Sequence, residues 1–187
     1  MPKQSFEPKK SFDIGIIPIG DIPQLILDVI AAHIVEYMNL EVRFMPDMAV
    51  PIQAWQQSRQ QYDAGRVLRC IDGRTRGDVE KLLGVLAVDL FIPIFTHVFG
   101  SARQGADCGI VSIYRLADHP QERTAPTPRL LERSAKVAMH EIGHLYDLVH
   151  CEDNHCLMHF SGNVEELDQL PVFFCRYCLS FLKQHPK

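Results

Sequence analysis

The alternation of apolar and polar residues predicts strands and amphipathic helices along the first part of the chain. Residues 14–19 are apolar residues interspersed with glycine and proline, which is typical of a short strand. Over residues 24–39 apolar residues recur every three or four positions, as on the buried face of a helix, and Asp21 and Gln24 form a capping-box pattern at its start. The buried stripe would hold Ile26, Val29, Ile30, His33 and Ile34.

Similar patterns predict further strands and helices. We expect strands at residues 40–45, 84–94 and 110–116, helices at 53–68 and 78–83, and a proline-rich loop at 117–128. Strands and helices that alternate in this way indicate a mixed sheet with helices packed on it, and therefore a fold of the α+β (mixed α/β) class. Thr127 and Pro128 supply the N-cap and first turn of another helix, which should end near residues 145–148.

A histidine-rich run lies at the end of this last helix, with the sequence His140-Glu-Ile-Gly-His-Leu-Tyr-Asp-Leu-Val-His150. His140 and His144 are four positions apart, about one helical turn, so both imidazoles project from the same face. Glu141 stands where its carboxylate can reach a water held by a metal between them, and His150 follows six residues after His144. Three neutral imidazoles with an open fourth position indicate a catalytic zinc site. The coincidence of spacing and glutamate disfavours a surface helix that merely carries histidines.

Four cysteines follow this run and predict a second metal site. Cys151, Cys156, Cys175 and Cys178 form a C-x4-C pair and a C-x2-C pair separated by eighteen residues. Two such pairs can wrap a tetrahedral zinc with four thiolates. Two disulfides are the alternative, which fits poorly with a chain that shows no secretory signal. His155 and His159 could replace a cysteine, but four thiolates already satisfy zinc, so we interpret both as loop histidines.

The composition limits the classes of protein that remain. A length of 187 residues suits one domain, and a net charge of −4 with a pI near 6.1 provides no broad surface for nucleic acid. The longest apolar run, residues 85–95, is too short to span a membrane. We therefore expect a soluble, cytoplasmic monomer whose basic N-terminal stretch, residues 3–10, is a frayed end. Cys70 and Cys108 are isolated in the sequence and are expected to be buried thiols.

The histidine run, together with Met158, resembles the metzincin metalloproteases, in which a methionine turn forms a hydrophobic base under three zinc-binding histidines. The adjoining cysteines narrow this resemblance to the archaemetzincins, whose histidine motif runs straight into a four-cysteine motif. Residues 84–93, 98–102 and 109–116 also look like that family. The resemblance thus covers most of the chain.

This resemblance implies one metzincin-like catalytic domain over residues 1–187, with a cleft between two lobes. An upper lobe, about residues 1–147, would hold a twisted mixed sheet and the active-site helix. A small zinc-stapled lower lobe, about residues 148–187, would hold the third histidine, the methionine turn and the cysteines. By position, the catalytic zinc would be bound by His140, His144 and His150, with Glu141 as the base. The structural zinc would be bound by Cys151, Cys156, Cys175 and Cys178.

Asp147 departs from the metzincin pattern, which has glycine at the point where the helix breaks toward the third histidine. The turn needs a left-handed backbone, which costs a residue with a Cβ roughly 1 kcal/mol. Asp tolerates this conformation better than most residues, so we expect Asp147 to form the turn. The alternative is that its carboxylate is a metal ligand, since carboxylates do bind zinc.

These features together predict a zinc-dependent peptidase with two zinc ions and peptide or protein substrates. Glu141 would accept a proton from the attacking water and pass it to the leaving amine. One alternative is a non-catalytic zinc protein that uses the four-cysteine element for structure or interaction; Glu141 argues against it, because pure metal binding needs no carboxylate there. Nucleic-acid binding through the cysteine element is disfavoured, since Arg176, Lys183 and Lys187 are too sparse for an electrostatic footprint.

Overall fold

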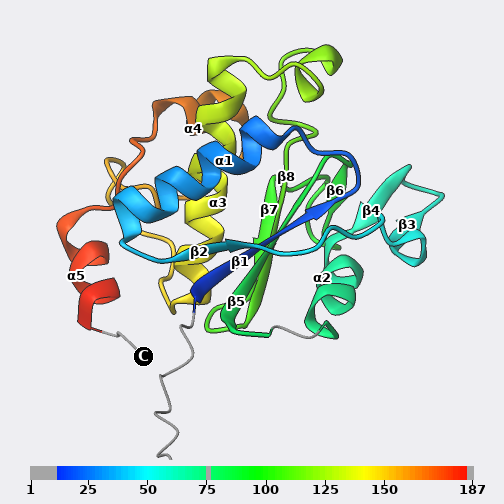
Figure 1. Ribbon diagram of the computed structural model, residues 1–187. Helices are drawn as coiled ribbons and strands as arrows, with labels where there is room; N and C mark the ends of the chain where they lie inside the picture. The colour runs from blue at the N-terminus through cyan, green and yellow to red at the C-terminus, as the bar shows by residue number, and fades with distance from the viewer. Residues whose placement is uncertain (1–11, 75–76, 185–187) are drawn as a thin grey trace, which may run out of the picture.

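The computed structural model describes residues 12–74 and 77–184, so the basic N-terminal stretch and Lys187 lie outside the described residues. The main feature is a five-stranded sheet in the order β2-β1-β5-β8-β7 (Figure 1). Its strands are β1 (Phe12–Ile19), β2 (Val42–Phe44), β5 (Val79–Leu86), β7 (Gly100–Ala102) and β8 (Cys108–Ser112). Neighbouring strands are parallel except at one edge, where β7 pairs antiparallel with β8. The predicted mixed sheet of an α+β fold is confirmed.

Helices cover both faces of this sheet (Figure 1). Ile14 and Ile16 of β1 belong to a core shared with α1 (Gln24–His33) and α3 (Pro128–Leu145). Ile17 and Ile19 belong to a second core shared with α2 (Ala64–Asp72). Successive side chains of a strand point to opposite faces, so a strand that is apolar in both registers is stable only where both faces are buried.

The predicted helix over residues 53–68 is wrong for residues 53–63, and only its end falls within α2. This region contains a short 3-10 turn, η2 (Ile52–Ala54), and two strands of a second sheet, which comprises β3 (Trp55–Gln56), β4 (Gln61–Asp63) and β6 (Leu90–Phe91). Gln60 has a positive φ of 55°, which lets the chain reverse so that Trp55 pairs with Tyr62. The Asp63 carboxylate accepts a hydrogen bond from the Arg66 backbone N–H at 3.1 Å, so α2 begins only at Ala64.

The predicted helix over residues 78–83 is also wrong, because β5 occupies this segment. Lys81 lies in β5 and is only 1% exposed. Its ammonium group donates to the Ala106 carbonyl at 3.0 Å and lies 3.7 Å from the Asp107 carboxylate. These partners allow a charged residue to occupy a central strand.

Several other predicted elements exist but end differently. The capping box at Asp21 is wrong, because the N-cap of α1 is Pro23 and makes no side-chain hydrogen bond. After His33 the helix continues as one π-helical turn, η1 (Ile34–Met38), and ends at Asn39, whose φ is 55°. In the predicted stripe Ile26, Ile30 and Ile34 are buried, whereas Val29 and His33 are partly buried. The predicted strand 40–45 is the shorter β2, and the predicted strand 110–116 is β8, which begins and ends earlier. The predicted strand 84–94 corresponds to the end of β5 and to β6. The predicted loop 117–128 contains η3 (Pro120–Arg123).

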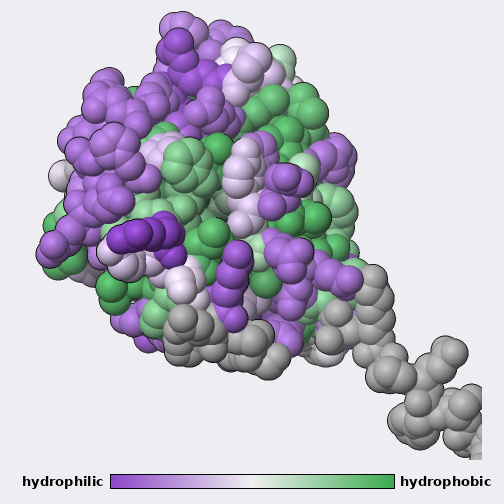
Figure 2. Space-filling view, turned by 90° about the vertical axis from the view of Figure 1, so that its left-hand side faces the viewer, coloured by the Kyte–Doolittle hydropathy of each residue, from purple (hydrophilic) through white to green (hydrophobic). Residues whose placement is uncertain are grey.

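The segment after α3 contains two short helices, α4 (Val164–Gln169) and α5 (Arg176–Gln184), in agreement with the expected scarcity of regular structure. Figure 2 shows the side of the molecule on which α1 and α5 lie, where apolar residues are visible in separate patches between hydrophilic ones. Over residues 12–74 and 77–184, no helix is long and apolar enough to cross a membrane. The division into lobes at residue 147 stays a prediction.

Candidate active site

Helix α3 carries the first part of the histidine run. The Thr127 hydroxyl accepts a hydrogen bond from the Leu130 backbone N–H at 3.3 Å, and Pro128 occupies the first turn, as predicted. The helix extends to Leu145, so His140, Glu141 and His144 lie in its last two turns.

The chain reverses immediately after α3. Asp147 has a φ of 68°, so the expected left-handed conformation is confirmed. The Leu148 N–H donates to the Gly143 carbonyl at 3.0 Å, which closes the helix end. The hairpin loop between β7 and β8 supports this turn: the Gly105 N–H donates to the His144 carbonyl at 2.9 Å, and the Gln104 side-chain amide donates to the Asp147 carbonyl at 2.9 Å. The turn brings His150 back toward the helix.

The three predicted histidines lie together. Their rings are 4.8 to 5.3 Å apart between centroids, and one nitrogen from each lies within 4.8 Å of the others. Nδ1 of His140 is 2.8 Å from the Leu157 carbonyl, and Nδ1 of His144 is 2.8 Å from the Leu148 carbonyl. As donors to these carbonyls, the Nδ1 atoms leave both Nε2 atoms free to bind a metal. Within the described residues, Asp147 is not part of this cluster.

The spacing of these nitrogens fits a zinc ion. The Nε2 atoms of His140 and His144 are 3.2 Å apart. A zinc ion at about 2.0–2.1 Å from two nitrogens in tetrahedral geometry would separate them by about 3.3–3.4 Å. Burial lowers the pKa of His140 to about 3, and burial also lowers the pKa values of His144 and His150. The imidazoles are therefore neutral near pH 7, the form that binds metal.

The Glu141 carboxyl group lies in the same site and is nearly buried. The residue is 8% exposed, and burial raises the pKa of its side chain to about 8. Among the described residues, no charge or hydrogen bond offsets this effect of burial on the pKa. The carboxylate packs on β7 at Gly100, where a Cβ would lie 2.6 Å from Oε1.

Met158 packs against α3 at Gly143, between His140 and His144 in sequence, and its role as a base under the histidines stays a prediction. Its side chain is fully buried, and a Cβ on Gly143 would come within 2.5 Å of its sulfur. The Met158 carbonyl accepts a hydrogen bond from the Cys151 N–H at 2.8 Å, which joins the histidine and cysteine segments.

The four predicted cysteines form a second cluster beside the first. Their sulfurs all lie within 4.8 Å of one another, and those of Cys151 and Cys175 are 3.9 Å apart. A tetrahedral zinc with bonds of about 2.3 Å would separate two sulfurs by about 3.8 Å, so the residues fit a four-thiolate zinc. All four cysteines are free thiols, which argues against the disulfide alternative. His155 is 85% exposed and pairs with Asp153, while His159 contacts the Cys151 carbonyl, as befits loop histidines.

A cavity of about 430 Å³ contains the histidines and Glu141. Its walls are strand β7, the preceding loop at residues 92–99 and the segment 160–162. Phe95 and Phe160 stack at 6.3 Å between ring centroids. Leu167 and Leu170 form another wall. These walls could not be predicted from the sequence, because they come from segments far apart in the chain.

Comparison with known proteins agrees with this geometry. The model of peptidase family M54 matches residues 24–184. The chain belongs to peptidase family M54, the archaemetzincins. The archaemetzincin of Methanopyrus kandleri is 37% identical over 172 residues, covering 90% of this chain and 93% of the relative. The archaemetzincin of Archaeoglobus fulgidus is 34% identical over 157 residues, covering 84% and 91%.

Solved structures give the same result. The crystal structure of the Methanopyrus kandleri archaemetzincin matches with a TM-score of 0.82 and 34% identity, covering 95% of this chain and 97% of that one. A zinc-dependent peptidase from Methanocorpusculum labreanum matches with a TM-score of 0.78 and 28% identity, covering 90% and 99%. This archaemetzincin is therefore a zinc metalloprotease that acts on peptide or protein substrates, as the sequence predicted.

Proposed function

We propose that this archaemetzincin hydrolyses peptide bonds with a zinc ion held by His140, His144 and His150 and with Glu141 as the proton acceptor. The observation that carries the proposal is the Glu141 carboxylate, which is buried in the same cavity as the three imidazoles. Burial favours the protonated acid, whereas a zinc ion held by the three histidines would favour the carboxylate, the form that accepts a proton from water.

The residues of the chain divide the reaction between them. Zinc, when bound, would supply Lewis acidity toward water and the scissile carbonyl. Glu141 takes a proton from the attacking water and passes it to the nitrogen of the leaving amine. The Leu157 and Leu148 carbonyls hold the His140 and His144 rings in orientation. Strand β7 lines the cavity at the edge of the sheet, where an extended peptide can pair with it.

A second zinc, bound by the four cysteines, belongs to the same proposal. The sulfur spacing supports it, and so does the scarcity of regular structure in the segment that carries the cysteines. This zinc would have no open position and would stabilise the fold. The net charge of −4 supports a protein without nucleic-acid partners, and we further propose a cytoplasmic monomer without membrane attachment.

The test measures zinc per chain and cleavage of a peptide library for the parent, Glu141→Gln and a control, Glu36→Gln. Glu36 is an exposed glutamate on η1 that does not line the cavity. We expect two zinc ions in all three proteins and loss of cleavage only in Glu141→Gln. Parent turnover in Glu141→Gln would remove the residue from its assigned role.

A further inference from the structure

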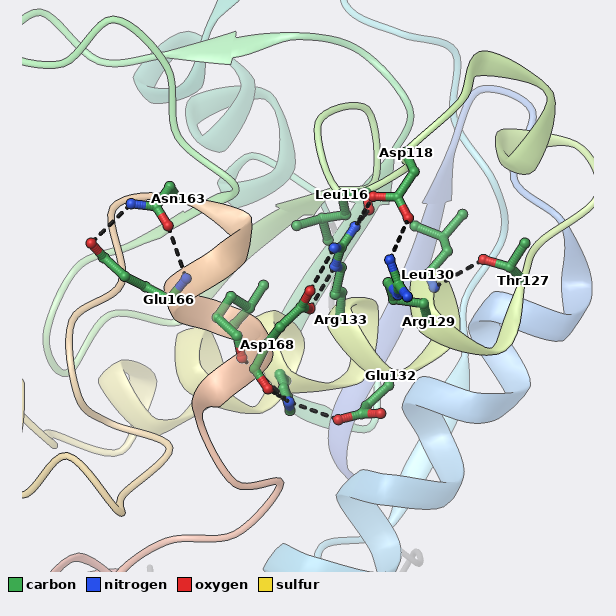
Figure 3. Close-up of polar contacts among 12 residues, drawn as sticks. Leu116, Asp118, Thr127, Arg129, Leu130, Glu132, Arg133, Asn163, Glu166 and Asp168 are labelled. Carbon is green, nitrogen blue, oxygen red and sulfur yellow. Dashed lines mark hydrogen bonds and ion pairs between the residues drawn. The ribbon is translucent and has the colours of Figure 1, made fainter.

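Helix α4 is too short to hold its own position. It has six residues, and isolated helices shorter than about 12–15 residues are marginal in water. Its first turn is fixed by a reciprocal cap: the side-chain Oδ1 of Asn163 accepts from the Glu166 backbone N–H at 2.8 Å, and the side-chain amide of Asn163 donates to the Glu166 carboxylate at 2.9 Å (Figure 3). This cap defines the helix, but contacts with α3 decide where the helix lies.

Arg133 of α3 makes the strongest of these contacts (Figure 3). Its guanidinium group donates two hydrogen bonds, both of 2.7 Å, to the two carboxylate oxygens of Asp168 on α4. The remaining nitrogen donates to Asp118 and to the Leu116 carbonyl, each at 2.7 Å. Arg133 is only 3% exposed. A bidentate pair fixes both the distance and the orientation of its partners, so it sets the separation of α4 from α3.

Lys136, one turn further along α3, holds the same C-terminal end of α4. Its ammonium group lies 3.3 Å from the Leu167 carbonyl, 3.5 Å from the Asp168 carbonyl and 2.7 Å from the Glu132 carboxylate. These three acceptors use all three N–H donors, and the two carbonyls belong to the last turn of α4. Lys136 also lines the active-site cavity, to which it therefore presents its methylene stem.

This arrangement forms an apolar part of the cavity between α3 and α4. We call this part the α4 subsite; its walls are Val137, Leu157, Leu167 and Leu170. Leu157, Leu167 and Leu170 are 1%, 3% and 6% exposed, so each is fixed by packing. Leu167 is the neighbour of Asp168 in sequence, so a shift of the Asp168 contact moves this wall.

We propose that Arg133 and Asp168 are positioning residues that set the width of the α4 subsite, and thereby the size of the apolar substrate side chain that the peptidase accepts there. Neither residue lines the cavity, so both act through the placement of α4. This proposal rests on the proposed function for its kinetic readout.

Asp118 provides a matched control. It pairs with the same guanidinium at the same distance as Asp168, and its side chain is 35% exposed, against 37% for Asp168. Asp118 accepts one hydrogen bond from Arg133 where Asp168 accepts two, and it precedes α3 in the chain, so Asp118→Asn removes an ion pair of the same guanidinium without releasing the wall.

The experiment compares kcat/KM of the zinc-loaded parent, Asp168→Asn and Asp118→Asn on peptides in which the residues beside the cleaved bond are Ala, Leu or Phe. At one position beside the cleaved bond, we expect Asp168→Asn to raise the ratio of kcat/KM for Phe peptides to kcat/KM for Ala peptides by at least about fivefold. One methylene in an apolar pocket changes such a ratio by about 10–200-fold. Asp118→Asn should stay within about twofold of the parent. An unchanged ratio in Asp168→Asn, or equal changes in both variants, would overturn the proposal.

Two additions separate the possible failures. Asp168→Glu keeps the charge but lengthens the contact by one methylene; it should change the same ratio, and it replaces Asp168→Asn if that variant does not fold. Binding of the same peptides is also measured by calorimetry in the Glu141→Gln background, where no turnover is needed. If the parent protein cleaves no peptide, only the proposed function is refuted. The ratio of the affinities for Phe and Ala peptides then still decides whether Asp168 controls the subsite.

Discussion

Replacing Gly100 with alanine should disable the peptidase by displacing Glu141. A Cβ at position 100 would lie 2.6 Å from Oε1, 2.7 Å from Cγ and 2.8 Å from Cδ of Glu141. The closest contact is about 0.9 Å shorter than the roughly 3.5 Å of an optimal contact, so the carboxylate must rotate away. Overpacking of this kind costs about 1–3 kcal/mol, which lowers Tm by about 2–12 °C in a chain of this size. A misplacement of about 1 Å costs on the order of 100-fold in kcat.

Gly84→Ala serves as the steric control. Its Cβ would lie 2.7 Å from methyl groups of both Ile19 and Ile71, so it produces a comparable overlap on the far side of the sheet from α3. We expect both variants to lose thermal stability, but only Gly100→Ala to lose kcat while KM and zinc content stay near those of the parent. Unfolding by scanning calorimetry and steady-state peptide cleavage measure the two effects.

Truncating the acid tests whether the clash itself is responsible. Glu141→Ala removes all three atoms that the new Cβ would meet, so the double variant Gly100→Ala/Glu141→Ala should be no less stable than Glu141→Ala alone. Parent-like turnover in Gly100→Ala, or an equal loss of kcat in Gly84→Ala, would refute the reasoning.

Further predictions concern the metals and pH. Mild chelation should first remove zinc from the three-histidine site, which has an open position, and elemental analysis should then find about one zinc per chain; persistence of that zinc in Cys178→Ser would contradict the assignment. Cys178→Ser should lower Tm and weaken zinc binding by the histidines, because His150 adjoins the cysteine cluster; unchanged values of both would mean that the cysteines bind no structural zinc. Asp147→Gly should be nearly neutral, since relief of roughly 1 kcal/mol of left-handed strain is offset by greater freedom of the unfolded chain; a tenfold loss of zinc affinity in a chelator competition would show that Asp147 orients a ligand. Hydrogen bonds from Arg133 lower the pKa values of Asp118 and Asp168, so their stabilisation is present above about pH 4 and is lost as the pH falls through the lowered values; urea unfolding of the doubly Asn-substituted chain should depend less steeply on pH in this range.

The active-site helix could be predicted from sequence because its signals are local. Thr127 and Pro128 mark its start within two positions, and the spacing of the histidines is itself a helical period. The left-handed turn at Asp147 was predictable for the same reason, since the third histidine can reach the first two only if the helix breaks there.

The misassigned segments depend on contacts that the local pattern does not contain. Residues 53–68 contain good helix formers, yet the left-handed Gln60 and the pairing of Trp55 with Tyr62 make a hairpin of the first half. The segment containing Lys81 is a strand because it lies between β1 and β8, and its charge is satisfied by a loop 25 residues away. Similarly, Gly100 and Glu141 are 41 positions apart, so sequence alone could not show that they touch.

The parallel pairing of β1 with β5 also determines when this chain can fold during synthesis. Phe12 pairs with Val79, a separation of 67 residues, so the central ladder cannot close until β5 has emerged. The ribosome adds about 5–20 residues per second, so Val79 is synthesised on the order of 3–13 s after Phe12. The core against which α3 packs does not exist before then, so both metal clusters must assemble late, on a sheet that is already in place. A nascent chain arrested before residue 79 should remain unfolded however much zinc is present.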